Sequence, residues 1–269
     1  MNTNRISLQF HRFETLDSTN TKAKELAVAG APHGTVVVAE EQSGGKGRLG
    51  RSFFSPKGSG IYLSAVIRPE EIGLTVEDTV LVTTAASVAV ARTVKTILDL
   101  DLTIKWVNDL YLNEKKVCGI LAEGVIEPKS NTISALVLGI GINYREPSEG
   151  FPEELKDIAG ALLPRNYQSH RDWKVLRDRL TEALAEELFA LLPHLADREF
   201  LKEYKDRSMV LGKQIRVFPK GASAQHPDLS ESSPLATALD ISENGGLIVQ
   251  YQDGSTETLT TGEISIRNV

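Results

Sequence analysis

The sequence is poor in cysteine, in aromatic residues and in long apolar runs, and each shortage excludes a class of protein. Cys118 is the single cysteine among 269 residues, which excludes an internal disulfide framework and a zinc site built from several cysteines. No apolar run reaches the ~18 residues of a membrane-spanning helix. Because the stretch from Met1 to Phe10 has no apolar core of a secretory signal, we expect a cytoplasmic protein.

Positive charge is also scarce. The chain has 30 lysine and arginine residues against 36 aspartate and glutamate residues, and its formal net charge is -6. This balance argues against a general binder of nucleic acid or membrane surfaces, so a local cationic cluster stands out.

The 5 histidines show no ligand spacing. We therefore expect no metal cluster and assign no metal ligands.

Most of the chain mixes short apolar strands with helices. Alternating or β-branched segments predict strands at 6–10, 35–39, 61–67, 103–106, 109–112, 117–125 and 133–142, with a hairpin turn at 113–115. Apolar residues at helical spacing predict helices from Asp17 or Ser18 to Gly30, from Val80 to Ala91, at 172–192 and at 197–205. Hairpins mixed with helices indicate an α+β fold rather than a doubly wound one.

The pattern changes at Gly212. Short strands are predicted at 214–218, 236–241, 247–251 and 257–259, between turns rich in glycine. Such spacing is typical of a small β-barrel, here with a polar loop from Pro219 to Pro234. We therefore predict two domains, 1–208 and 209–269.

The stretch Gly44–Arg51 is the most unusual in the sequence. It places the cations Lys46, Arg48 and Arg51 among four glycines. Glycine lets the backbone approach a ligand and point N–H groups at it, and arginine offers paired donors to phosphate or carboxylate oxygens. The stretch therefore predicts an anion site in a loop without helix or strand, which closes over its ligand as a lid.

Two other interpretations of this loop must be weighed. One is a basic surface loop that only turns the chain. The other is a P-loop, since the spacing is one residue away from that motif, with Arg51 in the place of its lysine. A P-loop must open a helix, and the stretch from Phe53 to Gly58 is a poor helix start, so the P-loop interpretation is disfavoured.

A second cluster, Lys105–Leu110, places a cation, an indole, an amide and a carboxylate between apolar strands. Burying such groups is costly unless they are paired or bind a ligand. The structural alternative is an ion pair of Lys105 with Asp109 beside a core Trp106. The functional alternative is a binding site.

Two strands that follow add further polar groups. Strict alternation would place Lys116 and Cys118 on one face of their strand and Gly119 on the other. Cys118 is interpreted as a small buried apolar residue rather than a nucleophile. The glycines of Gly139–Asn143 indicate close approach of a ligand, and Asn143 has the donor and acceptor that an adenine edge needs.

Together these motifs resemble those of the biotin protein ligases, also called biotin–[acetyl-CoA-carboxylase] ligases. The resemblance covers nearly the whole chain in the family's motif order: Asp17–Asn20, Gln42, Gly45–Arg51, Lys105–Asp109, Lys116–Leu121, Gly139–Asn143 and Gly262–Ser265. It implies a mixed sheet with flanking helices, similar to the class II aminoacyl-tRNA synthetase catalytic domain, and an SH3-like C-terminal barrel. The chain departs from the usual motifs where Lys46 replaces an arginine, Val107 a proline and Phe53 an aromatic residue that is often tryptophan.

The reaction implied by the resemblance has two steps. ATP would activate biotin to biotinyl-5′-AMP, and the biotin would then pass to a lysine of a biotin carboxyl carrier protein or another biotin-dependent carboxylase. Mg²⁺ would neutralise the β- and γ-phosphates of ATP. The implied catalytic residues are Lys116, Arg48 and Asp109. For Asp109, a role in orienting or deprotonating the acceptor lysine and a metal-binding or structural role stay equally open.

The resemblance also implies two sets of binding residues. For biotin they are Ser18, Thr19, Asn20, Gln42, Lys46, Gly47, Arg48, Trp106, Lys116 and Gly119. For the nucleotide they are Arg48, Arg51, Phe53, Asn108, Lys116 and Asn143. In this scheme Trp106 lines the thiophene and valeryl chain of biotin, and Phe53 stacks on adenine.

Two alternative functions remain. A lipoate–protein ligase shares the fold and chemistry, although the cationic loop and the C-terminal barrel favour biotin. A non-catalytic module regulated by a nucleotide is the alternative from a different class. We expect no nucleic-acid or membrane partner and, because only a short strand precedes Asp17, no repressor domain. Edge strands in such folds can pair between copies, which leaves a homodimer open.

Overall fold

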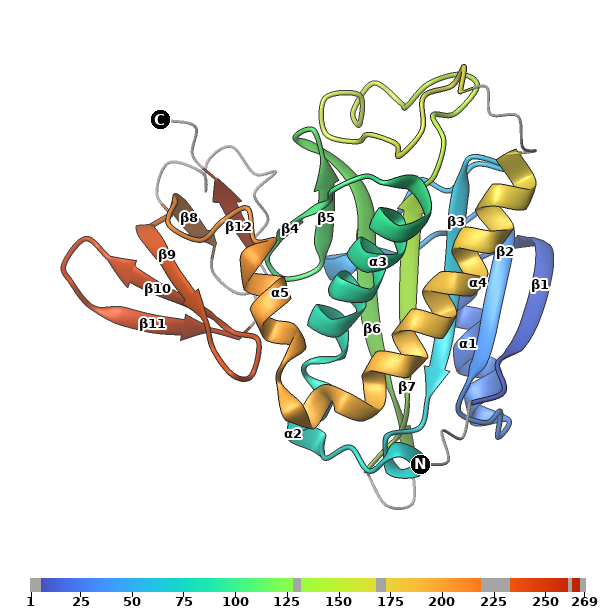
Figure 1. Ribbon diagram of the computed structural model, residues 1–269, viewed down its shortest axis with the longest axis horizontal. Helices are drawn as coiled ribbons and strands as arrows, with labels where there is room; N and C mark the ends of the chain where they lie inside the picture. Colours follow the sequence, from blue (N-terminus) through green and yellow to red (C-terminus); the bar gives the residue numbers. More distant parts are fainter. Residues whose placement is uncertain (1–5, 128–131, 168–172, 219–232, 261–262, 267–269) are drawn as a thin grey trace.

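The computed structural model describes residues 6–127, 132–167, 173–218, 233–260 and 263–266. Seven strands form one mixed sheet in the spatial order β1-β2-β3-β7-β6-β5-β4 (Figure 1). They are β1 (Gln9–Leu16), β2 (Thr35–Gln42), β3 (Gly60–Ile67), β4 (Thr103–Lys105), β5 (Asp109–Leu112), β6 (Lys115–Glu127) and β7 (Thr132–Asn143). The β1–β2 pair is parallel and the other neighbours are antiparallel, which confirms a mixed sheet.

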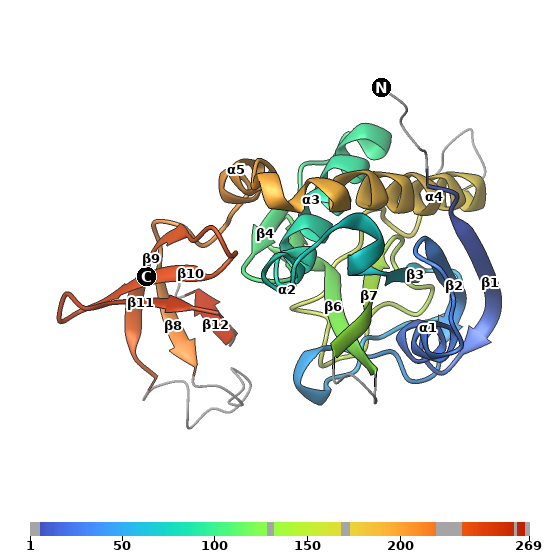
Figure 2. The same cartoon turned by 90° about the horizontal axis from the view of Figure 1, so that it is seen from below.

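Helices cover both faces of this sheet. Figure 2 shows α1 (Thr19–Val28) on one face, and α3 (Val82–Leu98) with α4 (Trp173–Leu191) on the other. The β-branched run of β2 explains this layering, because alternate side chains leave a strand on opposite faces. Val36 and Val38 join the core beneath α3 and α4, whereas Val37 packs in the separate core under α1.

The remaining helical turns are short. They are the 3₁₀ helices η1 (Arg48–Gly50), η2 (Pro69–Ile72) and η3 (Leu192–Asp197), and the helices α2 (Val76–Thr79) and α5 (Phe200–Asp206). The long helix was predicted to begin at Val80, but Val80 is 56% exposed and α3 starts at Val82. The reason is local: Thr75 and Asp78 form a capping box that starts the separate one-turn helix α2.

The first strand also differs from its prediction at 6–10. β1 begins at Gln9 and continues to Leu16, paired along its length with β2. Most of its side chains are exposed, as expected for an edge strand, so its sequence has no clear apolar alternation to locate it. Edge strands are therefore placed less well by their pattern than buried ones.

A second sheet follows the helices. Its five antiparallel strands lie in the order β11-β10-β9-β8-β12. They are β8 (Gln214–Phe218), β9 (Leu235–Ile241), β10 (Leu247–Tyr251), β11 (Thr256–Leu259) and β12 (Glu263–Ile266). The first four confirm the predicted strands, and β12 was not predicted. The sheet fits an SH3-like unit, but within the described residues its outer strands β11 and β12 do not pair, so the barrel is not closed.

The division of the chain at residue 209 stays a prediction. The predicted polar loop at 219–234 lies mostly outside the described residues, and so does Gly262 of the C-terminal motif. Within the parts of the chain that the structure covers, no helix is long and apolar enough to cross a membrane.

Candidate active site

The cationic loop leaves the end of β2 and folds back on itself. An isolated bridge joins Lys46 to Ser52, and the Gly47 amide donates to the Arg51 carbonyl at 2.7 Å. The expectation of a loop without regular structure is therefore only partly correct, because one turn of 3₁₀ helix, η1, sits at its tip. That turn places the Leu49 backbone in the left-handed region, at φ 56°.

Gly45 is required at the base of this loop. A Cβ at this position would lie 2.4 Å from the Phe53 carbonyl oxygen and 2.6 Å from the Ser55 hydroxyl. The Phe53 amide donates to the Gly45 carbonyl at 2.8 Å, which closes the loop. Close approach of two backbone segments, rather than of a ligand, thus explains this glycine.

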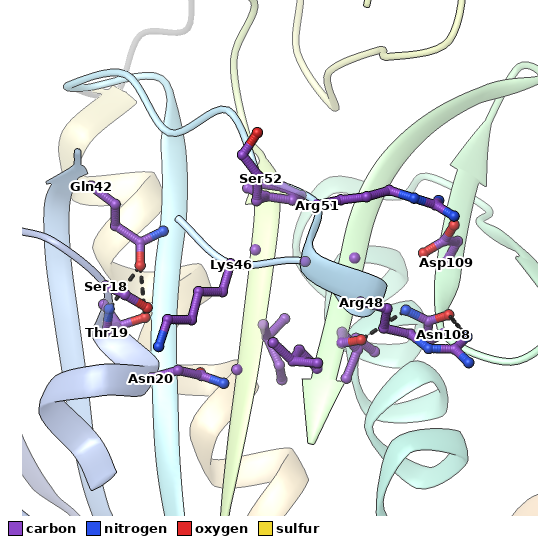
Figure 3. A pocket seen from close by; sticks show the side chains of 18 of the residues that line it. Ser18, Thr19, Asn20, Gln42, Lys46, Arg48, Arg51, Ser52, Asn108 and Asp109 are labelled. Atoms are coloured by element: carbon purple, nitrogen blue, oxygen red, sulfur yellow. Dashed lines mark hydrogen bonds between the residues drawn. The ribbon is translucent and has the colours of Figure 1, made fainter. Parts of the chain in front are cut away.

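The closed loop covers a pocket between β2, β6, β7 and the start of α1. The described lining residues are Ser18, Thr19, Asn20, Gln42, Lys46, Gly47, Arg48, Arg51, Ser52, Phe53, Leu63, Asn108, Asp109, Lys116, Gly119, Ile120, Leu121, Gly139, Ile140 and Gly141. Figure 3 shows two walls: neutral polar side chains of α1 and β2 on one side, and Arg48, Asn108 and Asp109 on the other, with Lys46 pointing toward Asn20. Most of the predicted site residues therefore meet in one place.

The neutral wall is ordered by hydrogen bonds from Gln42. Its Oε1 accepts from the Thr19 amide at 2.8 Å and from the Thr19 hydroxyl at 3.1 Å. Its Nε2 donates to the Ser55 hydroxyl at 2.9 Å. Ser18 and Thr19 are nearly inaccessible. The arrangement fixes which groups of this wall donate and which accept.

Asn20 is held in the same way. Its Oδ1 accepts from Ser64 at 2.6 Å, and its Nδ2 donates to Glu123 at 2.8 Å. Burial alone would raise the pKa of Glu123, but the hydrogen bonds from Lys24 and Asn20 lower it overall. Glu123 therefore stays an acceptor at neutral pH. A Cβ on Gly139 would lie 2.1 Å from Asn20 Oδ1, so this amide occupies the space above a glycine of β7.

The opposite wall gathers cations around one amide and one carboxylate. Arg48 Nη1 donates to Asn108 Oδ1 at 2.8 Å, and Asn108 Nδ2 donates to the Ile120 carbonyl at 2.8 Å. Lys116 Nζ lies 2.7 Å from Asp109 Oδ1 in an ion pair. Arg51 extends toward Asp109 in Figure 3. Several cations thus surround Asp109, which is the one carboxylate among the described lining residues.

The closeness of these cations to one another affects their pKa values. Burial is the main cause that lowers the pKa of Arg48, with Asp109 raising it and Arg51 lowering it further. Burial also chiefly lowers the pKa of Lys105, where Asp109 again opposes the shift and the cations Lys116 and Arg51 add to it. A bound anion would favour the charged forms of these groups. The wall is therefore suited to anionic ligands.

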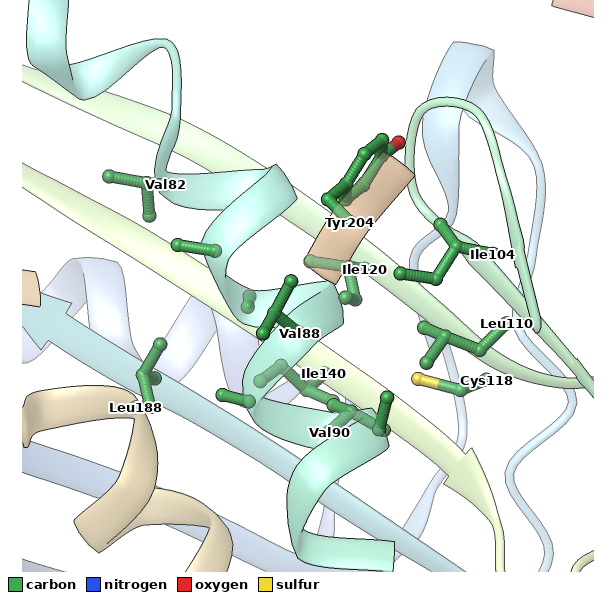
Figure 4. Close-up of a cluster of buried hydrophobic side chains, with 14 of the residues drawn as sticks. Val82, Val88, Val90, Ile104, Leu110, Cys118, Ile120, Ile140, Leu188 and Tyr204 are labelled. Atoms are coloured by element: carbon green, nitrogen blue, oxygen red, sulfur yellow. The ribbon is translucent and has the colours of Figure 1, made fainter. Parts of the chain in front are cut away.

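A register shift corrects the predicted alternation on β6. Asp109 pairs with Gly119 and Leu110 with Cys118, but Tyr111 pairs with Lys116. The strand thus has one extra residue at this point, so Lys116 reaches the pocket with Gly119 instead of pointing away from it. Cys118 lies in the core beside Leu110 (Figure 4), and burial raises the pKa of its thiol, consistent with the predicted apolar role.

Two predicted site residues do not line the pocket. Trp106 is 5% exposed, packs in the core, and donates from Nε1 to the Gly245 carbonyl of the C-terminal sheet at 2.9 Å, so its predicted contact with biotin stays a prediction. Asn143 donates through Nδ2 to the Gly160 carbonyl at 2.9 Å. Each occurs in a motif of which some other members line the pocket, such as Asn108 beside Trp106 and Gly141 beside Asn143. The direction of each side chain could not be read from the motif alone.

The floor of the pocket is a pair of glycines on β7. Gly139 lies beneath Asn20, and a Cβ on Gly141 would lie 2.7 Å from the Phe53 ring. The groups that approach these glycines closely are side chains of this chain, and close approach of a ligand stays a prediction. The residues Ser55, Ser64 and Glu123, which hold the neutral wall, were not predicted, because isolated polar residues on strands or in a loop carry no motif.

The fold and pocket agree with comparisons to known proteins. Residues 12–143 match the biotin/lipoate A/B protein ligase family, and residues 232–267 match the biotin protein ligase C-terminal domain. The bifunctional ligase/repressor BirA of Salmonella typhimurium is 30% identical over 266 residues, covering 94% of this chain and 72% of the relative. The chain belongs to the biotin protein ligase family.

Two further comparisons show how much of this biotin protein ligase family member is similar to known relatives. BirA of Bacillus spizizenii is 39% identical over 149 residues, a match that covers 55% of this chain and only 44% of the relative. The biotin protein ligase of Aquifex aeolicus, solved in complex with biotin and ATP, is 26% identical with a TM-score of 0.73. That match covers 97% of this chain and 99% of the Aquifex chain.

Proposed function

We propose that this chain is an ATP-dependent biotin–protein ligase. It forms biotinyl-5′-AMP and pyrophosphate, and then transfers biotin to a lysine of a biotin carboxyl carrier protein. The observation that carries the proposal is the two-walled pocket, in which a neutral hydrogen-bonding wall faces a cluster of cations. Biotin has a neutral ureido ring at one end and a carboxylate at the other, and its co-substrate is a polyanion. The two walls suit these two chemistries.

In the first step a biotin carboxylate oxygen attacks the α-phosphorus of ATP, and the bond to pyrophosphate breaks. Both reactants are anions, so the site must offset their repulsion. Lys116 stabilises the charge that develops between the carboxylate and the α-phosphate. Arg48 and Lys46 hold the phosphate and carboxylate region, and Arg51 contacts the triphosphate. The ion pair with Asp109 keeps the Lys116 ammonium at the pocket wall until an anion binds.

The neutral wall binds the ureido ring. Ser18, Thr19 and Gln42 offer donors and acceptors, and hydrogen bonds already fix the directions of the groups on Thr19 and Gln42. Such preorganisation reduces the ordering cost of binding. Phe53, which lies over Gly141 between the two walls, contacts the nucleotide. Closure of the loop over both ligands excludes water, which would hydrolyse the mixed anhydride.

In the second step the ε-amine of the carrier lysine attacks the carbonyl carbon of the anhydride. The bond to AMP breaks and the nitrogen loses a proton. Asp109 is the one carboxylate among the described lining residues, so it is placed to orient the incoming amine or accept its proton. An amine that approaches this wall also meets Lys116, whose positive charge favours the neutral, nucleophilic form.

Mg²⁺ enters this scheme as part of the substrate MgATP. Among the residues that the structure covers, no three or more His, Cys, Asp or Glu side chains converge on one point. Asp109 could hold a nucleotide-bound metal but could not cage a resident one. The residues present therefore fit a metal that is carried in by phosphate oxygens.

Three wider proposals accompany this function. The acceptor is a carrier protein of acetyl-CoA carboxylase or another biotin-dependent carboxylase, and the reaction takes place in the cytoplasm. Two copies pair through β1, which is an outer strand of the larger sheet, whereas β4 at the other edge already meets Ser208. Light scattering on the purified protein tests the dimer, and a monomer at micromolar concentration would contradict it.

Pyrophosphate exchange into ATP tests the first step. Exchange should require biotin and should not occur with lipoate. Mass spectrometry of a biotin carboxyl carrier fragment, after incubation with biotin and MgATP, tests the second step. Exchange that depends on lipoate would favour the lipoate–protein ligase alternative. Nucleotide binding without any exchange would favour a non-catalytic module.

A further inference from the structure

The turn between β9 and β10 in the C-terminal sheet contacts the larger sheet beside the pocket. Trp106, which is 5% exposed, donates from Nε1 to the Gly245 carbonyl at 2.9 Å. Gly245 has φ +74°, and a Cβ there would lie 3.2 Å from side-chain atoms of Leu81 and Thr84. The turn is therefore seated between α3 and the β4–β5 connection, where an added Cβ would be tightly packed and the positive φ would strain any residue but glycine.

The same connection is held by α5. The Tyr204 hydroxyl donates to the Val107 carbonyl at 3.1 Å. Next to it, the Ile104 amide donates to the Arg207 carbonyl at 2.8 Å, and the Met209 amide donates to the Ile104 carbonyl at 2.9 Å. Tyr204 and Ile104 are buried in one cluster (Figure 4). Residues after 200 thus hold β4 and the connection from the side away from the pocket.

On the pocket side, the connection leads into Asn108 and Asp109, which belong to the wall that faces the neutral one. Asn108, two residues beyond Trp106, accepts from Arg48 Nη1 at 2.8 Å and donates to the Ile120 carbonyl at 2.8 Å. A displacement of the connection would therefore move the acceptor that orients the Arg48 guanidinium. Asp109, the next residue, pairs with Lys116.

The neutral wall is held differently. Its residues Thr19, Asn20 and Gln42 are bonded to Ser55, Ser64 and Glu123, all of which lie before residue 124 in the chain. None of these bonds passes through the C-terminal sheet. Loss of the contact between Trp106 and Gly245 should therefore displace the wall that contains Asn108 and Arg48 and leave the neutral wall in place.

We propose that Trp106 is a positioning residue through which the C-terminal sheet sets Asn108 and Arg48 for adenylate formation. The inference rests on the proposed function and deepens it, because it assigns the C-terminal sheet to the nucleotide half of the site. The hydrogen bond to Gly245 fixes the indole, the indole fixes the connection, and the connection presents the amide that orients Arg48.

The substitution Trp106→Phe removes the donor and keeps an aromatic ring. Loss of one hydrogen bond predicts that kcat/KM for ATP in pyrophosphate exchange falls roughly two- to tenfold. The Kd of biotin, measured by calorimetry without nucleotide, should rise by a smaller factor, because Ser18, Thr19 and Gln42 of the neutral wall hold the ureido ring independently of Trp106. The matched control is Trp173→Phe, which alters the other tryptophan at a position outside the lining set and should leave both values unchanged.

A double-substitution cycle separates positioning from general loss of structure. If Trp106 acts through Asn108, Trp106→Phe should have little further effect on exchange in an Asn108→Ala background. Additive losses would overturn the proposal. A rise in biotin Kd that matches the fall in exchange would overturn it too, because a general structural defect would damage both walls.

Gly245→Ala tests the same contact from the other side with Trp106 intact. The added Cβ should displace the turn and reproduce the selective loss of exchange. In a Trp173→Phe background, where Trp106 is the only tryptophan, its fluorescence emission should shift to longer wavelength. Normal exchange by both variants would overturn the positioning role alone. Absence of biotin-dependent exchange in the unsubstituted protein would instead overturn the proposed function.

Discussion

At the scale of single residues, the pocket is defined by side chains that hold one another. The amides of Asn20 and Gln42 each have partners on both the oxygen and the nitrogen, so neither is free to flip. A ligand that meets this wall meets donors and acceptors in set directions. Selectivity between ring systems then depends on matching those directions, because a mismatched polar group would be buried without a partner.

The first prediction concerns Lys116. Replacing it by alanine should lower the rate of adenylate formation by two to three orders of magnitude, as expected from ~2.7–4 kcal/mol for one lost contact to developing charge. Measurement of biotin-dependent pyrophosphate release checks this. Lys115→Ala serves as control, because Lys115 precedes it on β6 and bonds to carbonyl groups at 156 and 157 outside the pocket. A nearly normal rate in Lys116→Ala would refute the assignment.

The second prediction concerns His33, which is 9% exposed. Its Nδ1 accepts from the Arg68 amide at 3.2 Å, whereas its Nε2 has no partner among the described residues. Burial lowers the pKa of His33 below its ordinary 6.5, with Glu71 opposing the shift. The unfolded chain therefore binds this proton more readily, so the stability contribution is constant above the unfolded pKa and declines as the pH falls below it.

Denaturant unfolding at a series of pH values checks this. His33→Asn keeps an acceptor for Arg68 but does not titrate, so it should flatten the decline below the unfolded pKa while lowering stability at all pH values through lost packing on Phe189. Parallel curves for parent and variant would contradict the assigned cause.

At the scale of elements, local pattern predicted what is buried and missed what is exposed or irregular. The strands at 35–39, 61–67 and 133–142 were found because both of their faces meet helices or neighbouring strands. β1 was displaced because an exposed edge strand has little apolar alternation. The register shift on β6 was missed because one additional residue leaves no mark in the composition.

The site residues were also predicted unevenly: those in whole motifs were placed better than single side chains. The loop and the residues on α1 and β2 were placed correctly in the pocket, because whole motifs there converge on it. Trp106 and Asn143 are not among the described lining residues, because within a motif the side-chain direction depends on tertiary contacts, here with Gly245 and Gly160. Partners such as Ser64 could only be found once the strands were assembled.

The third prediction concerns the base of the cationic loop. Gly45→Ala would place a Cβ 2.4 Å from the Phe53 carbonyl oxygen, so the loop must shift and carry Arg48 with it. Adenylate formation should fall at least tenfold, while the melting temperature changes little. Gly124→Ala is the matched control, because nothing lies within 4 Å of its Cβ position. Equal activities of the two variants would contradict the packing argument.

At the scale of the whole molecule, a chain of net charge -6 concentrates cations in one pocket. The cations of the pocket must attract anionic ligands against the net negative charge of the whole chain. Attraction between exposed charges weakens with salt, whereas contacts inside a closed pocket are screened much less. Substrate capture should therefore depend on ionic strength more than chemistry does.

The fourth prediction follows from this. Raising salt from roughly 50 to 500 mM should lower kcat/KM for MgATP, with a smaller effect on kcat. Biotin carries one charge and should show a weaker dependence, and an uncharged biotin analogue should show almost none. Steady-state exchange rates check MgATP and biotin, and calorimetric Kd values at the same salt concentrations check the uncharged analogue, which cannot form an adenylate. Equal salt dependence for the three ligands would contradict electrostatic capture.

The two glycines of β7 have one last consequence. Gly139 seats an amide from α1, and Gly141 seats a ring from the loop, two positions further along the same strand. Their spacing is set by the repeat of extended backbone, about 3.3 Å per residue, which no side-chain substitution alters. The extended backbone of β7 thus fixes the separation between Asn20 and Phe53, the two side chains that it seats. A ligand that contacts both of these side chains must span that fixed separation.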